Sequence, residues 1–101
     1  MRTFAERLIG KTIKSIENGA AGYSIVISFS DGTAITVNTE VTALLKEAHA
    51  SQVGSVTITK EQVTMHLSGD GFVAIATDRE RFFNVVELFI YRDDEGFVVE
   101  N

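Results

Sequence analysis

The stretch SVTITKEQVTMHL, residues 55–67, holds the side chains best suited to chemistry in this sequence of 101 residues. If it forms a hairpin, Ser55 lies opposite His66, and a hydroxyl beside an imidazole could act as nucleophile and general base. Such a site also needs an acid that orients the imidazole and donors that stabilise an oxyanion. The sequence has no nucleophile-elbow motif, and an open strand provides no pocket. We therefore predict no catalytic residues and no enzymatic activity.

The same hydroxyl groups also suit a binding surface. Apolar and polar residues alternate, so the hydroxyls and His66 share one face of the predicted hairpin. Threonine favours strands, and a cross-strand pair such as Thr57 with Thr64 is stabilising, so a solvated sheet face explains the pattern without any function. The functional alternative is an interaction face made by Thr57, Thr64, His66 and Phe72.

Metal and cofactor sites are not predicted. The acidic run at 93–95 and the turn at 68–71 are rich in oxygen ligands, but neither has the ligand spacing of a calcium loop. The two histidines, His49 and His66, lie on different expected elements without a zinc spacing, and the chain has no cysteine. We interpret both oxygen-rich segments as turns.

Two helices are expected from capping and periodicity. The pattern Thr3-Phe-Ala-Glu6 is a capping box, which predicts a short helix over residues 4–9 that ends at Gly10. Further along, apolar residues recur at i, i+3, i+4 and i+7, which indicates an amphipathic helix over residues 40–50. Its apolar stripe consists of Val41, Leu44, Leu45 and Ala48.

Three hairpins are predicted from loop length, because directly opposed residues must share a sheet face. The first has a three-residue loop at 30–32 with Gly32 in the left-handed region, and the third has a loop at 69–71. The second has an even loop, of two residues at 60–61 or of four residues at 59–62. The predicted pairs are Ile25 with Val37 and Ile27 with Ile35 in the first hairpin, Val56 with Met65 and Ile58 with Val63 in the second, and Leu67 with Val73 and Met65 with Ile75 in the third.

The segment at 78–91, DRERFFNVVELFIY, fits two structures. The apolar residues that follow Asp78 have helical spacing, which favours a helix. The β-branched and aromatic residues of the same segment favour a strand. We divide it into a turn near 78–82 and a strand at 84–92, because the short strand after the turn at 93–96 needs a partner. That last strand contains Phe97, Val98 and Val99, which we predict to form an edge that pairs with another chain.

Size and charge limit the classes of function. A chain of 101 residues forms one domain, and a net charge of −5 with a pI near 4.9 argues against a nucleic-acid-binding surface. No segment has the roughly 18 apolar residues of a membrane span. The N-terminal apolar patch contains Glu6 and Arg7 and so does not resemble a signal peptide. With the absence of cysteine, this predicts a cytoplasmic protein.

The expected fold is a single α+β domain over residues 1–101. It comprises a mainly antiparallel sheet of six to eight short strands in a hairpin meander, with two helices packed on one face. We expect a non-enzymatic protein-interaction or regulatory module without a cofactor, whose partner is another protein or a second copy in a homodimer. The alternative is a small-ligand-binding domain with a pocket between the helix at 40–50 and the sheet. Neither nucleic acid nor membrane is an expected partner.

Overall fold

The computed structural model describes residues 3–19, 24–45 and 51–100, and most of them lie in strands. The described part of the chain begins with a short helix, α1 (Phe4–Leu8), and continues through strands alone. These are β1 (Ile13–Asn18), β2 (Ile25–Phe29), β3 (Ala34–Val37), β4 (Val41–Leu44), β5 (Val53–Ile58), β6 (Gln62–Leu67), β7 (Phe72–Ala76), β8 (Phe89–Asp93) and β9 (Gly96–Glu100).

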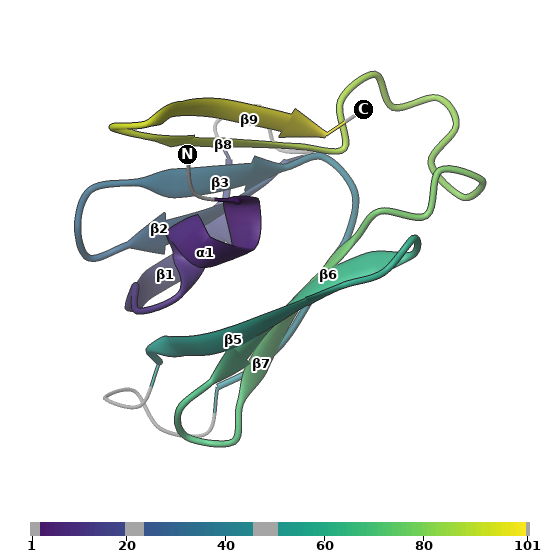
Figure 1. Ribbon diagram of the computed structural model, residues 1–101. Helices are drawn as coiled ribbons and strands as arrows, with labels where there is room; N and C mark the ends of the chain where they lie inside the picture. Colours follow the sequence, from purple (N-terminus) through teal and green to yellow (C-terminus); the bar gives the residue numbers. More distant parts are fainter. Residues whose placement is uncertain (1–2, 20–23, 46–50, 101) are drawn as a thin grey trace.

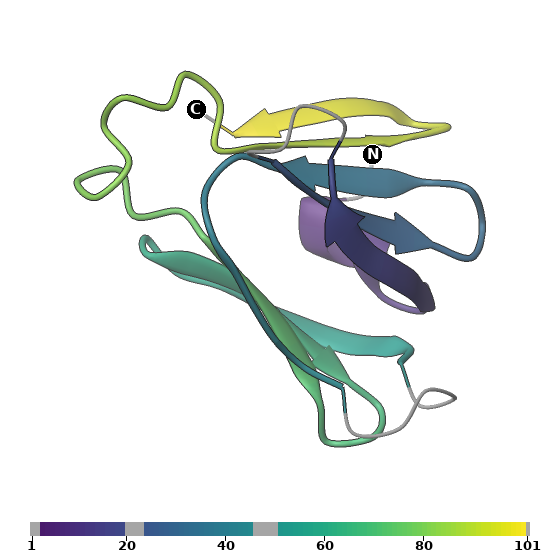
Figure 2. The ribbon, with the colours of Figure 1, turned by 180° about the vertical axis from the view of Figure 1, so that it is seen from behind.

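The strands form two antiparallel sheets. One has five strands in the order β1-β2-β3-β8-β9, and the other has four in the order β4-β7-β6-β5. Because β8 pairs with β3, the whole second sheet is inserted in the chain between two neighbouring strands of the first. Figure 1 shows the sheets as two layers that diverge toward one side, with α1 between them, and Figure 2 shows the same arrangement from behind.

The core lies between the two sheets and is filled by alternate residues of both. Helix α1 adds Leu8, which is fully buried, and Phe4, whose ring stacks on Phe89 with the ring centroids 5.1 Å apart. The largest fully buried side chains are Tyr91, Phe29, Phe89, Leu8, Ile27, Ile35, Met65, Ile75, Val37, Val53 and Val73. The helix therefore contributes to the core and does not cover an outer sheet face.

The expected α+β fold is wrong. Strands account for 54% of the described residues and helix for 6%, in one short helix, and there are two sheets where one was expected. Two sheets that cover each other's apolar faces need no layer of helices to close the core. The predicted capping box of the first helix is confirmed, since the Thr3 side chain accepts from the Glu6 N–H and the Glu6 carboxylate accepts from the Thr3 N–H.

The helix predicted at 40–50 is contradicted where the structure describes it. Residues 41–44 form β4, which pairs with β7, and the Ala76 N–H donates to the Glu40 carbonyl at 2.9 Å. Pairing with β7 satisfies backbone groups of both strands, and Val41 of β4 packs against the core. Leu44 and Leu45, part of the predicted apolar stripe, are 45% and 47% exposed. Residues 46–50 lie outside the described part.

The predicted registers of the first two hairpins are confirmed. Strands β2 and β3 pair Ile25 with Val37 and Ile27 with Ile35, and Gly32 has a φ of +90° in the three-residue loop. Strands β5 and β6 pair residues 55–58 with residues 66–63 as predicted, including Thr57 opposite Thr64. Polar and apolar alternation therefore fixed the inward face of each of these hairpins.

The predicted register of the third hairpin is wrong. Strands β6 and β7 pair Met65 with Val73, so the loop is 68–70, and Asp70 takes the left-handed conformation with a φ of 65°. Gly71 serves another purpose, because a Cβ there would overlap the Leu44 carbonyl oxygen. That glycine permits the close approach of β4 and β7, which no local turn pattern indicates.

The turn predicted near 78–82 is confirmed, but the strand predicted at 84–92 begins later, at Phe89. The N–H groups of Arg81 and Phe82 both donate to the Asp78 carbonyl. The Arg79 guanidinium donates to the carbonyls of Phe82, Val85 and Val86. These carbonyls are thereby hydrogen-bonded to a side chain. The bonds hold residues 82–86 in the loop that connects β7 of one sheet to β8 of the other.

Candidate interaction surface

The predicted interaction face lies on the outer side of the four-stranded sheet. Met65 and Val73 point into the core and are fully buried, so the alternate residues Thr64, His66 and Phe72 point outward. His66 pairs with Phe72 across β6 and β7, and Thr57 lies on the neighbouring strand β5. The structure therefore brings all four predicted residues onto one face.

This face contains a shallow hollow of about 420 Å³. Its lining is Thr42, Gln62, Thr64, His66, Phe72 and Ala74. The His66 Nε2 and the Thr57 hydroxyl are 2.9 Å apart, and the Gln62 amide donates to the Thr64 hydroxyl at 3.1 Å. His66 thus bonds Thr57, although Ser55 is the residue opposite it. These polar side chains form hydrogen bonds with one another along the sheet, as polar side chains do on a solvated sheet face.

The second predicted surface, at Phe97, Val98 and Val99, lies in β9, which is the last strand of the five-stranded sheet. Val98 is half-buried and packs against the core, whereas Phe97 and Val99 point outward and are 67% and 42% exposed. Phe97 lies beside Arg92 of β8, whose guanidinium carbon is 5.5 Å from the ring centroid. Val99 lies beside Ile90.

Among the described residues, the backbone groups of β9 that no strand pairs belong to Phe97 and Val99. The Glu100 carbonyl accepts from the Leu88 N–H at 2.7 Å, so the backbone of Glu100 faces the β8 side. Backbone groups alternate in direction along an antiparallel strand, so Gly96 and Val98 face β8 as well, and Phe97 and Val99 face away. The sequence of β9, GFVVE, has no lysine or proline, which are the residues that commonly block an exposed edge.

A second hollow, of about 670 Å³, adjoins this edge on the outer face of the five-stranded sheet. It is lined by Asp31, Gly32, Thr33, Ala34, Thr36, Ile90, Arg92, Asp93, Asp94 and Phe97. Its walls combine the exposed Phe97 ring with both positive and negative groups. The edge strand β9 thus has an accessible backbone, and the hollow beside it adds an apolar surface and charged neighbours.

A buried ion pair holds the β8–β9 hairpin from its inner side. The Arg7 guanidinium bonds both Asp93 carboxylate oxygens and donates to the Gly96 carbonyl at 2.7 Å. The Tyr91 hydroxyl donates to the same carboxylate at 2.9 Å. The hydrogen bond from Arg7 is the main cause that holds the pKa of Asp93 well below its usual range. Burial, together with the bond to Asp93, raises the pKa of Tyr91.

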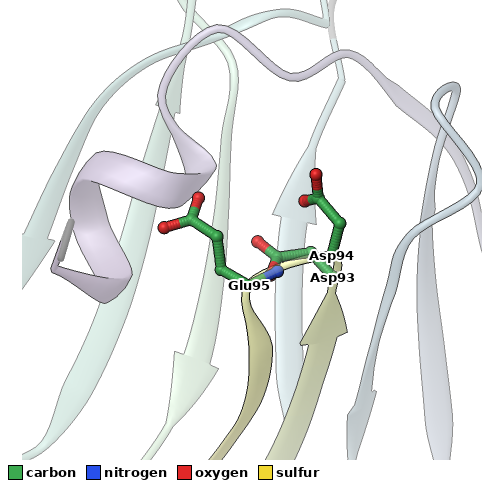
Figure 3. Close-up of side chains that lie close together, drawn as sticks. All are labelled: Asp93, Asp94 and Glu95. Carbon is green, nitrogen blue, oxygen red and sulfur yellow. The ribbon is translucent and has the colours of Figure 1, made fainter.

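The acidic turn has three carboxylates whose ligand atoms lie within 4.8 Å of one another, on Asp93, Asp94 and Glu95. Figure 3 shows the three side chains projecting from the turn between β8 and β9. The oxygens of Asp93 already accept from Arg7, from Tyr91 and from the Glu95 N–H at 2.7 Å. Residues 94–95 form the predicted turn between β8 and β9, and a bond from a turn N–H to the preceding aspartate side chain is typical of such turns.

A further apolar surface, which was not predicted, lies on the loop between β7 and β8. Phe83 and Val86 are each 82% exposed, although both are large and apolar. The three bonds from Arg79 to the loop carbonyls hold the segment that carries them. The run FFNVV was the available signal, but its β-branched and aromatic residues also fit a strand.

Comparison of the chain with family profiles, curated proteins and solved structures returned no match. The fold and surface described above are therefore the basis for a functional proposal. Within the described residues, no helix combines the length and hydrophobicity needed to cross a membrane.

Proposed function

We propose that the protein is a non-enzymatic interaction module that binds another polypeptide along the free edge of β9. The observation that carries this proposal is that β9 ends its sheet with Phe97 67% exposed and with the backbone of Phe97 and Val99 facing away from β8. An added strand would receive backbone hydrogen bonds from this edge, and its alternate side chains would contact Phe97 and Val99.

The outer face of the four-stranded sheet supports this proposal less well. Thr64 is 8% exposed, and its hydroxyl is bonded to Gln62 within the same strand. A partner on this face would gain contacts with Phe72 and His66 but no free backbone. We therefore place the principal binding surface at β9 and treat the face of Thr57, Thr64, His66 and Phe72 as a secondary surface.

The small-ligand alternative loses its predicted location, because residues 41–44 form a strand and not part of a helix. Four residues were candidates to line such a pocket. Phe29, Met65 and Phe89 are at most 1% exposed and pack in the core, and Phe82 is half-buried against it. The acidity of the chain, with a net charge of −5, supports a protein partner over a nucleic acid. The lack of cysteine supports a cytoplasmic location as part of the same proposal.

The proposal is tested by capturing binding partners with the immobilised protein, with a variant changed at β9 and with a control variant changed at another edge strand. Immobilised wild-type protein, Phe97→Asp and Ile58→Asp are each exposed to lysate that contains the tagged chain itself as well as the native proteins. Ile58 is a fair control because it lies on the edge strand β5 and is 56% exposed. We expect a stoichiometric bound chain that Phe97→Asp loses and Ile58→Asp keeps. Equal capture by all three proteins would contradict binding at β9.

A further inference from the structure

The free edge of β9 has a symmetry that points to its partner, and the argument here rests on the proposed function. The outward backbone groups belong to Phe97 and Val99, one on each side of Val98. A two-fold axis at Val98 would place Phe97 of one copy opposite Val99 of the other, and Val99 opposite Phe97. Each facing pair could then exchange N–H···O bonds in both directions.

We propose that two copies of this chain pair antiparallel through β9 about a two-fold axis at Val98, so that two five-stranded sheets become one continuous sheet. This contact is isologous, because the same strand is used by both copies, and it closes without leaving a further β9 edge. Shifting the register by two residues in either direction would move one of the facing residues beyond the described end of β9 or into its turn. The register centred on Val98 therefore uses the strand in full.

The side chains agree with this register. On the outer face, each Phe97 ring lies beside Val99 of the other copy, and an aromatic residue opposite a β-branched one is a favourable cross-strand pair. Ile90 and Arg92 extend this row on either side, since they are the β8 neighbours of Val99 and Phe97. Gly96, which has no side chain, lies opposite Glu100 of the other copy and leaves space for it.

The contact area of this dimer is small, so the dimer should be weak. Pairing of two five-residue strands, with their exposed Phe97 and Val99, buries on the order of 1,000 Å² in total, near the lower limit for a specific interface. The β7–β8 loop rises beyond β9 beside the C-terminal end of that strand in both views (Figures 1 and 2). In an antiparallel dimer this loop would lie near the β8–β9 turn of the other copy.

The net charge predicts how dimerisation depends on salt. Each copy carries a net charge of −5, and Glu100 of one copy comes close to the acidic turn at 93–95 of the other. Salt screens this repulsion, so self-association should strengthen as ionic strength rises. A foreign strand with basic ends would show the opposite dependence, because salt would weaken its attraction to the same acidic groups.

The experiment is sedimentation of the full chain over a concentration series from about 1 µM to 1 mM, at low and high salt, with Val99→Lys and Ile58→Lys alongside. We expect a dimer with a dissociation constant in the micromolar range that tightens with salt. Val99→Lys should weaken it by about tenfold or more, because symmetry doubles the effect, and Ile58→Lys should not change it. Circular dichroism verifies folding, and Phe97→Ser replaces Val99→Lys if the latter unfolds.

Isotope-filtered NMR on a mixture of labelled and unlabelled copies then tests the register. Contacts between the Phe97 ring of one copy and the Val99 methyl groups of the other are expected. A monomer throughout the series, or a dimer indifferent to Val99→Lys and Phe97→Ser, overturns the homodimer. If the monomer still captures a foreign protein that Phe97→Asp loses, only the choice of partner fails. If capture is also independent of Phe97, the proposed function fails as well.

Discussion

The guanidinium of Arg7 bonds both carboxylate oxygens of Asp93, a residue 86 positions further along the chain. Both side chains are buried, at 4% and 1% exposure. Because Arg7 also donates to the Gly96 carbonyl, the helix α1 is fixed to both strands of the C-terminal hairpin. The surface proposed to bind a partner is thus supported on its inner side by a residue from the other end of the chain.

Removing one member of this pair should lower stability, because the remaining charge stays buried without its partner. For Asp93→Ala we expect a fall in melting temperature of more than about 5 °C. Asp94→Ala is the control, since Asp94 lies on the same turn and is exposed. Thermal unfolding followed by circular dichroism measures both, and equal melting temperatures would show that the pair contributes nothing.

The protein should lose stability in acid through two aspartates. Arg7 lowers the pKa of Asp93, and at Asp31 burial acts to raise the pKa but the bonds from Lys11 and Thr33 outweigh it and lower the pKa to about 2. The pKa of an aspartate in the unfolded chain is about 3.9. A carboxyl whose pKa is lower than this in the folded state stabilises the fold at any pH above about 3.9. This stability is lost as the pH falls from about 4 toward 2.

Urea unfolding at a series of pH values from 7 to about 2.5 measures this dependence. We expect Asp93→Asn and Asp31→Asn to be less stable at neutral pH and to lose less stability on acidification than the wild type. If the slopes of stability against pH match the wild type below pH 4, these two groups are not responsible.

Gly71→Ala should weaken the pairing of β4 with β7, because the added Cβ would overlap the Leu44 carbonyl oxygen. We expect a loss of roughly 1–3 kcal/mol in the free energy of unfolding, as for other overpacking substitutions. The matched control is Gly54→Ala in β5, where the nearest atom to the new Cβ would be 3.7 Å away, and its effect should stay within about 1 kcal/mol. Chemical denaturation compares them, and equal losses would contradict the close approach.

Arg79→Ala should release the β7–β8 loop without unfolding the sheets. The guanidinium bonds the carbonyls of Phe82, Val85 and Val86, so its loss should raise amide hydrogen exchange at 82–87 by about tenfold. Arg81→Ala is the control, because its ion pair with Glu40 is more than half exposed and exposed pairs contribute little. Unchanged exchange in Arg79→Ala would show that the loop is held by other contacts.

Local features of this fold could be predicted from the sequence. The registers of β2 with β3 and β5 with β6 follow from alternation and turn chemistry, both of which operate over a few residues. The same reasoning placed Thr57, Thr64 and His66 on one outward face. The register after β6 was misjudged because Gly71 was assigned to a turn, whereas its role depends on Leu44 in a distant strand.

Features set by distant contacts could not be predicted. The stripe at Val41, Leu44 and Leu45 has helical spacing, but residues 41–44 pair with β7, about 30 residues later in the chain, and spacing within the stripe carries no sign of that pairing. Arg7 and Asp93 were each visible as charged residues, but nothing in the sequence links two positions so far apart. The edge at β9 was recognisable from its FVV run, whereas its support by α1 was not.

Because one sheet is inserted in the chain between two strands of the other, some strands are synthesised well before their neighbours. Strands β2 and β3 leave the ribosome before β8, which is the second neighbour of β3 and lies about 50 residues later. At a synthesis rate of roughly 5–20 residues per second, one side of the apolar strand Ala34–Val37 therefore remains unpaired for several seconds. The nascent chain and the finished protein thus expose different edges, β3 during synthesis and β9 afterwards, and only the second persists long enough to serve as a binding surface.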